Sequence, residues 1–448
     1  MIIMKFGGTS VGSPDRIKEV ADILVGHGDS LLVVLSAMSG TTNTLVEIAN
    51  CYRQGADDQA EQLIAALEAR YMQHIEQLYS TPEMRSTTKQ LLHERFQFLR
   101  SFAGDYFSSF EEKQILAQGE IMSTNMMVNY LLENGHQACL LDALQMVYTN
   151  KDGDPDLSRI QSAAQSHIQA TNTDNKRPTI FITQGFICTN AFGEIDNLQR
   201  GGSDYTATLL GAALHCEEVQ IWTDVDGIHT ADPRIVEHTQ AIREVSFDVA
   251  AELARFGAKI LHPTCVTPAQ QTGVPIRLKY TMQPAAAGTL ICDSQDSSAA
   301  HASRCGITAI ASKEPLALVR LKPRHNLPTV QLLKRVCDTL IATQQTPDLM
   351  ALSGADVLLC LSANAVEGLR KELHHCCDSS KEDAVCLIAI VGNYSESPQL
   401  QQDVLAAIRQ IDSSAQLGGI SPLSITLVVK ADDKQRTLVH LHKTLLER

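Results

Sequence analysis

The hydrophobic pattern at the start of the chain alternates short apolar runs with amphipathic segments. Apolar runs at 1–6 and 31–37 predict buried strands. Ser13 and Pro14 between them predict a helix start, because serine caps helices and proline is favoured in their first turn. Residues 41–134 then follow a helical pattern. The chain is therefore predicted to open with a βαβ unit that carries a helical insertion.

Strands and helices alternate again as far as residue 291. The predicted strands lie at 138–143, 179–187, 218–223 and 275–278, and the predicted helices lie at 157–170, 203–214 and 247–256. This alternation predicts an α/β domain with an open, mostly parallel sheet and helices on both faces. Ligands of such sheets bind at the carboxyl ends of the strands.

A polar, serine-rich stretch at 293–304 predicts a linker, and the pattern changes after it. Strands are predicted at 307–321, 356–362, 384–391 and 424–429, and helices at 329–341, 365–374, 399–411 and 434–447. We interpret 305–380 and 381–448 as two α+β modules of βαββαβ type, whose strands can interleave. They would follow a first domain at 1–292.

Charge and cysteine content narrow the class of protein. The net charge is −14 with no run of lysine or arginine, which argues against nucleic acid and membrane surfaces as partners and favours a small-molecule enzyme. No apolar stretch reaches the roughly 18–20 residues of a membrane span. The 12 cysteines form no C-x-x-C pair, which is typical of reduced thiols, and adjacent residues at 374–377 face different ways, so no metal site is predicted. We expect a cytoplasmic location.

Basic residues next to glycine turns predict anion binding. Lys5 closes the first apolar run and precedes glycines at 7–8, whose backbone N–H groups can approach a phosphate closely. Arg200 precedes two glycines at a predicted helix start, and its planar fork suits a carboxylate or phosphate. Lys259 follows another predicted helix. These features favour phosphoryl transfer by positioning and charge neutralisation.

A hydrolase is an alternative, since residues 8–12 match the G-x-S-x-G pattern of a nucleophile elbow. That interpretation leaves Lys259 unexplained and requires a positioned histidine that no motif supplies.

The motifs taken together resemble those of the aspartate kinases. The matching segments occur in the family's order and lie at 5–10, 36–43, 119–123, 183–186, 200–206, 222–234 and 256–263. The C-terminal part is similar to the paired ACT modules of that family. The resemblance implies an amino-acid-kinase fold followed by two ACT modules. It also implies ATP-dependent phosphorylation of L-aspartate to 4-phospho-L-aspartate, the first step toward lysine, threonine and methionine.

The resemblance also implies site residues and cofactors. The nucleotide would be held by Lys5, Gly7, Gly8, Ser36, Thr223, Asp224, His229, Arg234 and Lys259. Aspartate would be bound by Thr42, Glu120, Phe186, Arg200, Ser203 and Asp204, and the catalytic residues would be Lys5, Lys259 and Asp204. The substrate carboxylate, with a pKa of ~4, is already ionised at pH 7 and needs no general base. Mg²⁺ would be held mainly by ATP phosphates and water rather than by a dedicated protein site.

Two departures from the family concern regulation and the nucleotide. His229 stands where the family commonly has tyrosine, and Gln331 stands where lysine-sensitive members usually have glycine. The residues implied to bind an amino-acid effector, lysine or threonine, are Asn326, Thr329, Gln331 and Asp348. Effector identity stays open, and the ACT modules imply a homodimer or larger homo-oligomer. The alternatives are a kinase of the same fold acting on another carboxylate such as glutamate, and a catalytically silent amino-acid sensor.

Overall fold

A computed structural model describes most of the chain. The described residues are 1–28, 30–104, 106–171, 179–198, 201–257, 261–293, 306–324, 327–395, 397–411 and 415–447. The predicted site residues Arg200, Lys259 and Asn326 lie outside them. By its internal contacts the chain divides into two units, the first formed by 1–227 and 260–293 and the second by 228–259 and 294–448.

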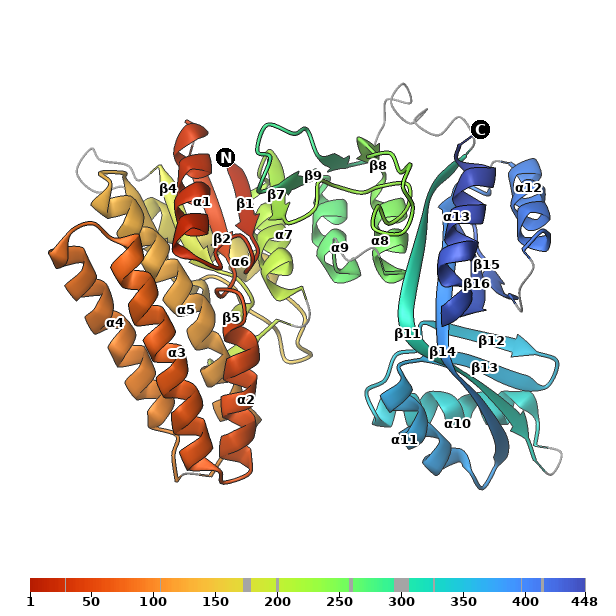
Figure 1. Ribbon diagram of the computed structural model, residues 1–448. Helices are drawn as coiled ribbons and strands as arrows, with labels where there is room; N and C mark the ends of the chain where they lie inside the picture. The colour runs from red at the N-terminus through yellow and green to blue at the C-terminus, as the bar shows by residue number, and fades with distance from the viewer. Residues whose placement is uncertain are drawn as a thin grey trace. The chain divides into compact units, whose positions relative to one another are not determined.

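The first unit is an α/β structure with an elongated helical layer (Figure 1). Its strands are β1 (Ile2–Phe6), β2 (Leu31–Leu35), β3 (Ala138–Leu141), β4 (Ile180–Gln184), β5 (Ile187–Thr189), β6 (Ile195–Asn197), β7 (Glu218–Thr223), β9 (Ile276–Tyr280) and β10 (Thr289–Ile291). Its helices are α1 (Pro14–Gly26), α2 (Thr41–Arg53), α3 (Asp57–Leu78), α4 (Pro82–Arg100), α5 (Ser109–Glu133), α6 (Leu157–Ala170), α7 (Gly202–Leu214) and α9 (Pro263–Thr272).

The main sheet of this unit runs in the order β3-β4-β2-β1-β7-β9-β10. Neighbouring strands are parallel from β3 to β9, and β10 is antiparallel to β9. Along β1, Met4 and Phe6 pack into the core shared with α1 to α5, whereas Ile3 lies toward Gly211 of α7. Helices therefore cover both faces, which confirms the predicted fold class. Lys5 shares the α7 face with Ile3, because side chains alternate along a strand.

The second unit contains the short strand β8 (Glu244–Val245), the helix α8 (Phe247–Arg255) and a six-stranded antiparallel sheet. The strands of that sheet are β11 (Ile307–Pro323), β12 (Leu349–Ser353), β13 (Asp356–Leu361), β14 (Cys377–Gly392), β15 (Gln416–Ile420) and β16 (Ser424–Lys430). The helices are α10 (Thr329–Ala342), α11 (Ala363–Leu373), α12 (Pro398–Arg409) and α13 (Lys434–Leu445).

The strands β11 and β14 are long and serve both halves of this sheet, whose order is β12-β13-β11-β14-β16-β15. The second half of β11 and the first half of β14 pack with α10 and α11 around one core. Their other halves pack with α12 and α13 around a second core. The two modules thus share one continuous sheet (Figure 1).

Residues 228–259 fold with the second unit. Ala231 and Val236 lie in the core formed by α12 and α13, and the N–H of Ile310 donates to the carbonyl of Thr230 at 2.8 Å. The predicted first domain, 1–292, contained this segment, whereas its contacts assign it to the C-terminal unit. The predicted boundaries within 293–448 stay predictions.

Several predicted elements differ from the observed ones. The strand predicted at 179–187 is two strands, because the chain turns at Phe186, which has a φ of 69°. The strand predicted from 384 starts at Cys377, and the edge strands β12 and β15 were not predicted. None of the helices in the described part of the chain combines the length and apolar character needed to cross a membrane.

Candidate active site

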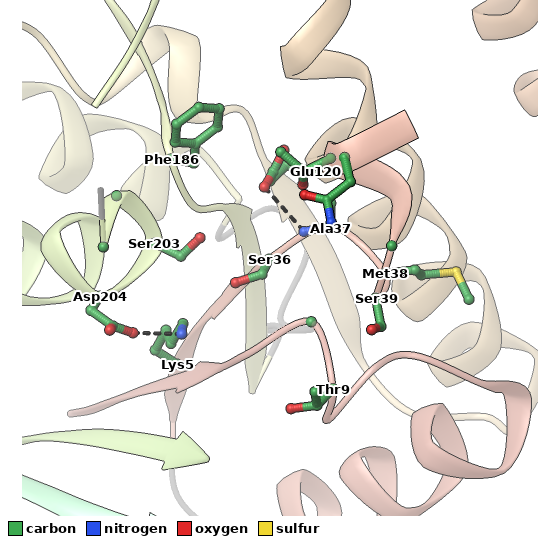
Figure 2. Close-up of a pocket in the computed structure, with 16 residues that line it drawn as sticks. Lys5, Thr9, Ser36, Ala37, Met38, Ser39, Glu120, Phe186, Ser203 and Asp204 are labelled. Carbon is green, nitrogen blue, oxygen red and sulfur yellow. Dashed lines mark hydrogen bonds and ion pairs between the residues drawn. The ribbon is translucent and has the colours of Figure 1, made fainter. Parts of the chain in front are cut away.

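Eight of the predicted site residues gather around one pocket of the first unit. The pocket has a volume of about 420 Å³ and lies where β1, β2, α5 and α7 meet (Figure 2). The predicted site residues that line it are Lys5, Gly8, Ser36, Thr42, Glu120, Phe186, Ser203 and Asp204. They come from chain segments that are far apart in the sequence, so the fold itself assembles the site.

The floor of the pocket carries an ion pair. Lys5 Nζ lies 2.5 Å from Asp204 Oδ1, and the two side chains are only 11% and 15% exposed. Lys5 ends the buried strand β1, while Asp204 lies in the first turn of α7, where a carboxylate interacts favourably with the helix dipole. The pair keeps a lysine ammonium at the pocket in a fixed position (Figure 2).

Glu120 is a buried acid at the opposite side of the pocket. Its side chain lies in the middle of α5, and Oε1 accepts a hydrogen bond from the N–H of Ala37 at 3.1 Å. Burial raises the pKa of Glu120 to about 8, although the Ala37 N–H and the charge of Lys5 both lower it. Oε2 is buried and has no partner among the described residues. A cationic group in the pocket would satisfy this oxygen and stabilise the ionised carboxylate.

The glycine turn after β1 lets two loops touch. A Cβ atom at Gly8 would lie 2.8 Å from the carbonyl oxygen of Ala37, and the N–H of Ser39 donates to the carbonyl of Gly8 at 3.1 Å. Only glycine fits this approach without moving the backbone. The turn therefore brings the ends of β1 and β2 together at the pocket. Gly7 does not line the pocket; its N–H donates to the carbonyl of Trp222 at 3.4 Å.

The start of α7 forms another wall. Gly201, Gly202 and Ser203 line the pocket at the N-terminus of this helix, where backbone N–H groups favour anions. Phe186 faces it with a positive φ, a conformation that is strained for a bulky residue. The N–H of Phe186 donates to Thr206 Oγ1 at 3.0 Å, which holds this conformation in place.

The pocket also includes residues that the sequence interpretation did not select. These are Thr9, Ala37, Met38, Ser39, Gly40, Asn43, Gly201 and Gly202. All of them belong to the quoted motifs or stand beside them, so their position in a glycine-rich loop was the available signal. Ser39 and Asn43 add polar groups to the wall formed by the loop after β2.

Of the other predicted nucleotide residues, Thr223, Asp224, His229 and Arg234 do not line this pocket, and Lys259 lies outside the described residues. Thr223 ends β7, and its hydroxyl donates to Asp224 Oδ1 at 3.1 Å. His229 and Arg234 belong to the second unit: His229 Nδ1 lies 3.2 Å from Thr239 Oγ1, and Arg234 makes a two-pronged contact with Asp232 at 2.7 and 2.9 Å. No group of three or more side chains suited to hold a metal ion occurs among the described residues.

Of the predicted effector residues, Thr329 and Gln331 lie in the first turn of α10, Asp348 directly precedes β12, and Asn326 lies outside the described residues. Thr329 opens α10, and the side chain of Gln331 is exposed. Asp348 forms an ion pair with Lys313, with 2.5 Å between Oδ1 and Nζ. This acid already has a cationic partner within the chain.

Comparisons with known proteins agree with this arrangement. A model described as the Amino acid kinase family matches residues 1–279. The lysine-sensitive aspartokinase 3 of Escherichia coli (strain K12) is 31% identical, over 100% of this chain and 99% of that protein. Aspartokinase 1, chloroplastic, of Arabidopsis thaliana is 29% identical, over 99% of this chain and 80% of that protein.

Solved structures match as well. The crystal structure of E. coli aspartokinase III in complex with aspartate and ADP gives a TM-score of 0.82 at 30% identity and covers 99% of each chain. The aspartate kinase of Clostridium acetobutylicum, at 19% identity and a TM-score of 0.79, shares the fold. Because the relatives match along the whole chain, both its kinase and its C-terminal parts, the chain belongs to the amino acid kinase family and, within that family, to the aspartokinases.

Proposed function

We propose that the chain transfers the γ-phosphoryl group of ATP to the side-chain carboxylate of L-aspartate and forms 4-phospho-L-aspartate. The observation that carries this proposal is the pocket, where a fixed lysine ammonium and a buried acid with an unpartnered oxygen face one hollow. The similarity to a structure that holds aspartate and ADP supports the same function.

The reaction needs positioning and charge neutralisation more than acid–base chemistry. The attacking carboxylate of aspartate is ionised at neutral pH, since its pKa is ~4. Lys5, held by Asp204, would stabilise negative charge on the transferring phosphoryl group. The N–H groups at the start of α7 would add further donors for anionic oxygens.

Glu120 would recognise the ammonium group of aspartate. The ammonium would supply the cation that the unpartnered Oε2 lacks, and burial would make the contact strong. Thr42 and Ser203 would contribute hydroxyl groups to the carboxylates, with Arg200 as the proposed guanidinium partner.

The nucleotide and its metal are proposed from the resemblance. Thr223, Asp224, His229, Arg234 and Lys259 would contact ATP. Mg²⁺ would supply positive charge at the phosphates of ATP, held largely by phosphate and water with at most one or two protein carboxylates. The cytoplasmic location stays a prediction from the cysteines; none of the 11 described cysteines is in a disulfide.

The second unit would bind an amino-acid effector and join two copies of the chain. Its sheet is similar to the regulatory part of the matched aspartokinases, one of which was solved with lysine and aspartate. Exposed apolar side chains on the edge strands β12 and β15, Met350, Leu352, Leu417 and Ile420, offer a surface for a homodimer.

A coupled ADP-release assay with aspartate, glutamate and homoserine tests the proposed reaction. We expect turnover with aspartate, little with the other acceptors, and a loss of about 10²–10³ in kcat for Lys5→Met, as for removal of a charge-stabilising donor. Lys18→Met is the matched control, because Lys18 is a partly exposed lysine of α1 that does not line the pocket. Preferred turnover of glutamate would favour the alternative carboxylate kinase, and ATP-independent amino-acid binding without turnover would favour a silent sensor.

A further inference from the structure

The pocket wall formed by residues 39–43 has an unusual support. Gly40 adopts a φ of 79° and precedes α2, and no side chain caps this helix start. Ser39, Gly40, Thr42 and Asn43 all line the pocket, whereas Thr41 is fully buried and does not. The position of this wall therefore depends on what holds Thr41.

Two side chains of α3 hold Thr41. Arg70 Nη2 donates to Thr41 Oγ1 at 2.9 Å, and the hydroxyl of Tyr71 lies 3.0 Å from the same oxygen. A hydroxyl has two acceptor sites and one donor, so Thr41 Oγ1 can satisfy both contacts. Tyr71 belongs to the helical layer and is completely buried. Its burial fixes the position of the hydroxyl that contacts Thr41.

The guanidinium of Arg70 lies directly behind the pocket wall. A Cβ atom at Gly40 would lie only 3.3 Å from Arg70 Nη1, and Arg70 Cζ is 5.9 Å from the centre of the Tyr71 ring. The side chain is partly buried, and its Nε atom is buried without a hydrogen-bond partner. Within the described part of the chain, no carboxylate lies within ion-pair distance of it. The hydrogen bond to Thr41 is therefore the polar contact that the structure shows for this guanidinium.

We propose that Arg70 is a positioning residue for the acceptor substrate. Through Thr41 it fixes the segment from Gly40 to Asn43, so that Thr42 meets the carboxylates of the substrate in a constant geometry. The inference rests on the proposed function, because it assumes that the pocket takes aspartate. Arg70 acts through Thr41 and the wall and not by contact with the reacting atoms.

Three substitutions test the chain of contacts. Arg70→Met keeps the aliphatic stem but removes the donor, Thr41→Val removes the hydroxyl at constant volume, and Thr41→Ser keeps the hydroxyl. We expect the first two to raise the KM for aspartate about tenfold, as for loss of a hydrogen bond from a charged donor, with the KM for ATP changed by less than about twofold. Thr41→Ser is expected to behave like the wild type. The double variant Arg70→Met/Thr41→Val should be no worse than Thr41→Val alone, because Thr41→Val already removes the contact with Arg70.

Arg100→Met is the matched control. Arg100 of α4 also braces α3, through Glu61 at 3.0 Å and Glu68 at 2.8 Å, but it contacts no residue of the pocket wall. Its loss is expected to lower the melting temperature and leave the KM for aspartate unchanged. If both arginine variants raise this KM equally, the effect is general loosening of the helical layer and the proposal fails.

Other outcomes also decide the matter. A folded Arg70→Met enzyme with an unchanged KM for aspartate, or an equal rise in the KM for ATP, overturns the proposal. If Arg70→Met does not fold by circular dichroism, Arg70→Lys replaces it, and a wild-type KM for aspartate in that variant overturns the proposal, since lysine lacks the planar fork. Absence of aspartate-dependent turnover in the wild type would instead refute the proposed function, so the two failures are distinguishable.

Discussion

A single buried acid, Glu120, distinguishes this pocket at the scale of residues. Glutamate in the middle of a long helix is normally exposed, yet here only 3% of it is accessible and its pKa is raised to about 8 by burial. The chain keeps this unfavourable group where the pocket needs a carboxylate. Such a perturbed acid inside a pocket is a typical functional feature.

Glu120→Gln should separate stability from activity. The ordinary pKa of glutamate is 4.5, whereas that of Glu120 in the folded chain is about 8. Between these two pH values the folded chain keeps a proton on Glu120 that the unfolded chain has lost. The free energy of unfolding therefore falls as pH rises through this range. Glutamine still accepts from Ala37 but does not ionise. We expect a melting temperature at pH 8 equal to or above that of the wild type, with aspartate binding weakened at least about tenfold.

The same acid predicts a pH dependence of substrate binding. If Glu120 binds the ammonium group of aspartate as proposed, it must be ionised, so the KM for aspartate should fall as pH rises from 7 to about 8.5 through the raised pKa of Glu120. Steady-state kinetics over this range, at saturating ATP, measure the effect. A KM in Glu120→Gln that varies with pH as in the wild type would show that another group is responsible.

Close packing between α5 and the loop after β2 sets the site at the scale of elements. A Cβ atom at Gly119 would lie 2.8 Å from the Cβ of Ala37 and 3.3 Å from Leu45 Cδ1. Gly119 adjoins Glu120, and Ala37 supplies the N–H that Glu120 accepts. The distance between helix and loop thus controls where the acid lies.

Gly119→Ala should push α5 away from this loop. We expect a loss of about 1–3 kcal/mol in the free energy of unfolding, as for overpacking, and a kcat/KM for aspartate reduced at least about tenfold. Denaturant titration and kinetics measure both effects. Gly368→Ala in α11 is the matched control, since nothing lies within 4 Å of its Cβ position, and it should stabilise by up to about 1 kcal/mol with unchanged kinetics. Wild-type kinetics in Gly119→Ala would show that the loop after β2 can shift to accommodate the added methyl group.

Feedback control belongs to the scale of the whole molecule. Gln331 adds a long side chain at the start of α10, and Asp348 is already paired with Lys313. If the effector binds at the proposed residues, the Gln331 side chain would crowd it, and Asp348 would have to leave Lys313 to meet its ammonium group. We expect lysine to inhibit the wild type weakly and Gln331→Gly to lower the inhibitory concentration of lysine roughly 10- to 150-fold, which corresponds to about 1–3 kcal/mol. Inhibition assays on the full chain measure the lysine sensitivity of the wild type and of Gln331→Gly. Equal sensitivity of the two enzymes would show that the Gln331 side chain does not weaken lysine binding.

Oligomer formation is the second prediction at this scale. The exposed apolar side chains of β12 and β15, with Leu352 57% and Leu417 51% exposed, should be covered by a second copy of the chain. Sedimentation velocity is expected to give a dimer or larger species. The double variant Leu352→Lys/Leu417→Lys should shift it toward monomer, whereas the exposed Val25→Lys of α1 should not. A wild-type monomer at micromolar concentration would contradict the prediction.

The order and type of most elements could be predicted from local sequence patterns. The predicted bounds of α6 and β7 agree with the structure, because hydrophobic periodicity and capping residues act within one segment. Eight predicted site residues line the pocket, and most of them stand in short motifs of glycine with charged or hydroxyl residues. Glu120 was predicted from the resemblance, and the polar residues Thr9, Ser39 and Asn43 were not selected.

Which of those residues meet, and in what environment, depends on how the whole chain folds. Lys5 and Asp204 are 199 positions apart, and the burial of Glu120 follows from packing around α5 rather than from its sequence. The sharing of β11 and β14, the unpredicted edge strands and the assignment of 228–259 to the second unit likewise depend on contacts between distant segments. Such contacts leave no local periodicity in the sequence, because they are chosen by the packing of the whole core.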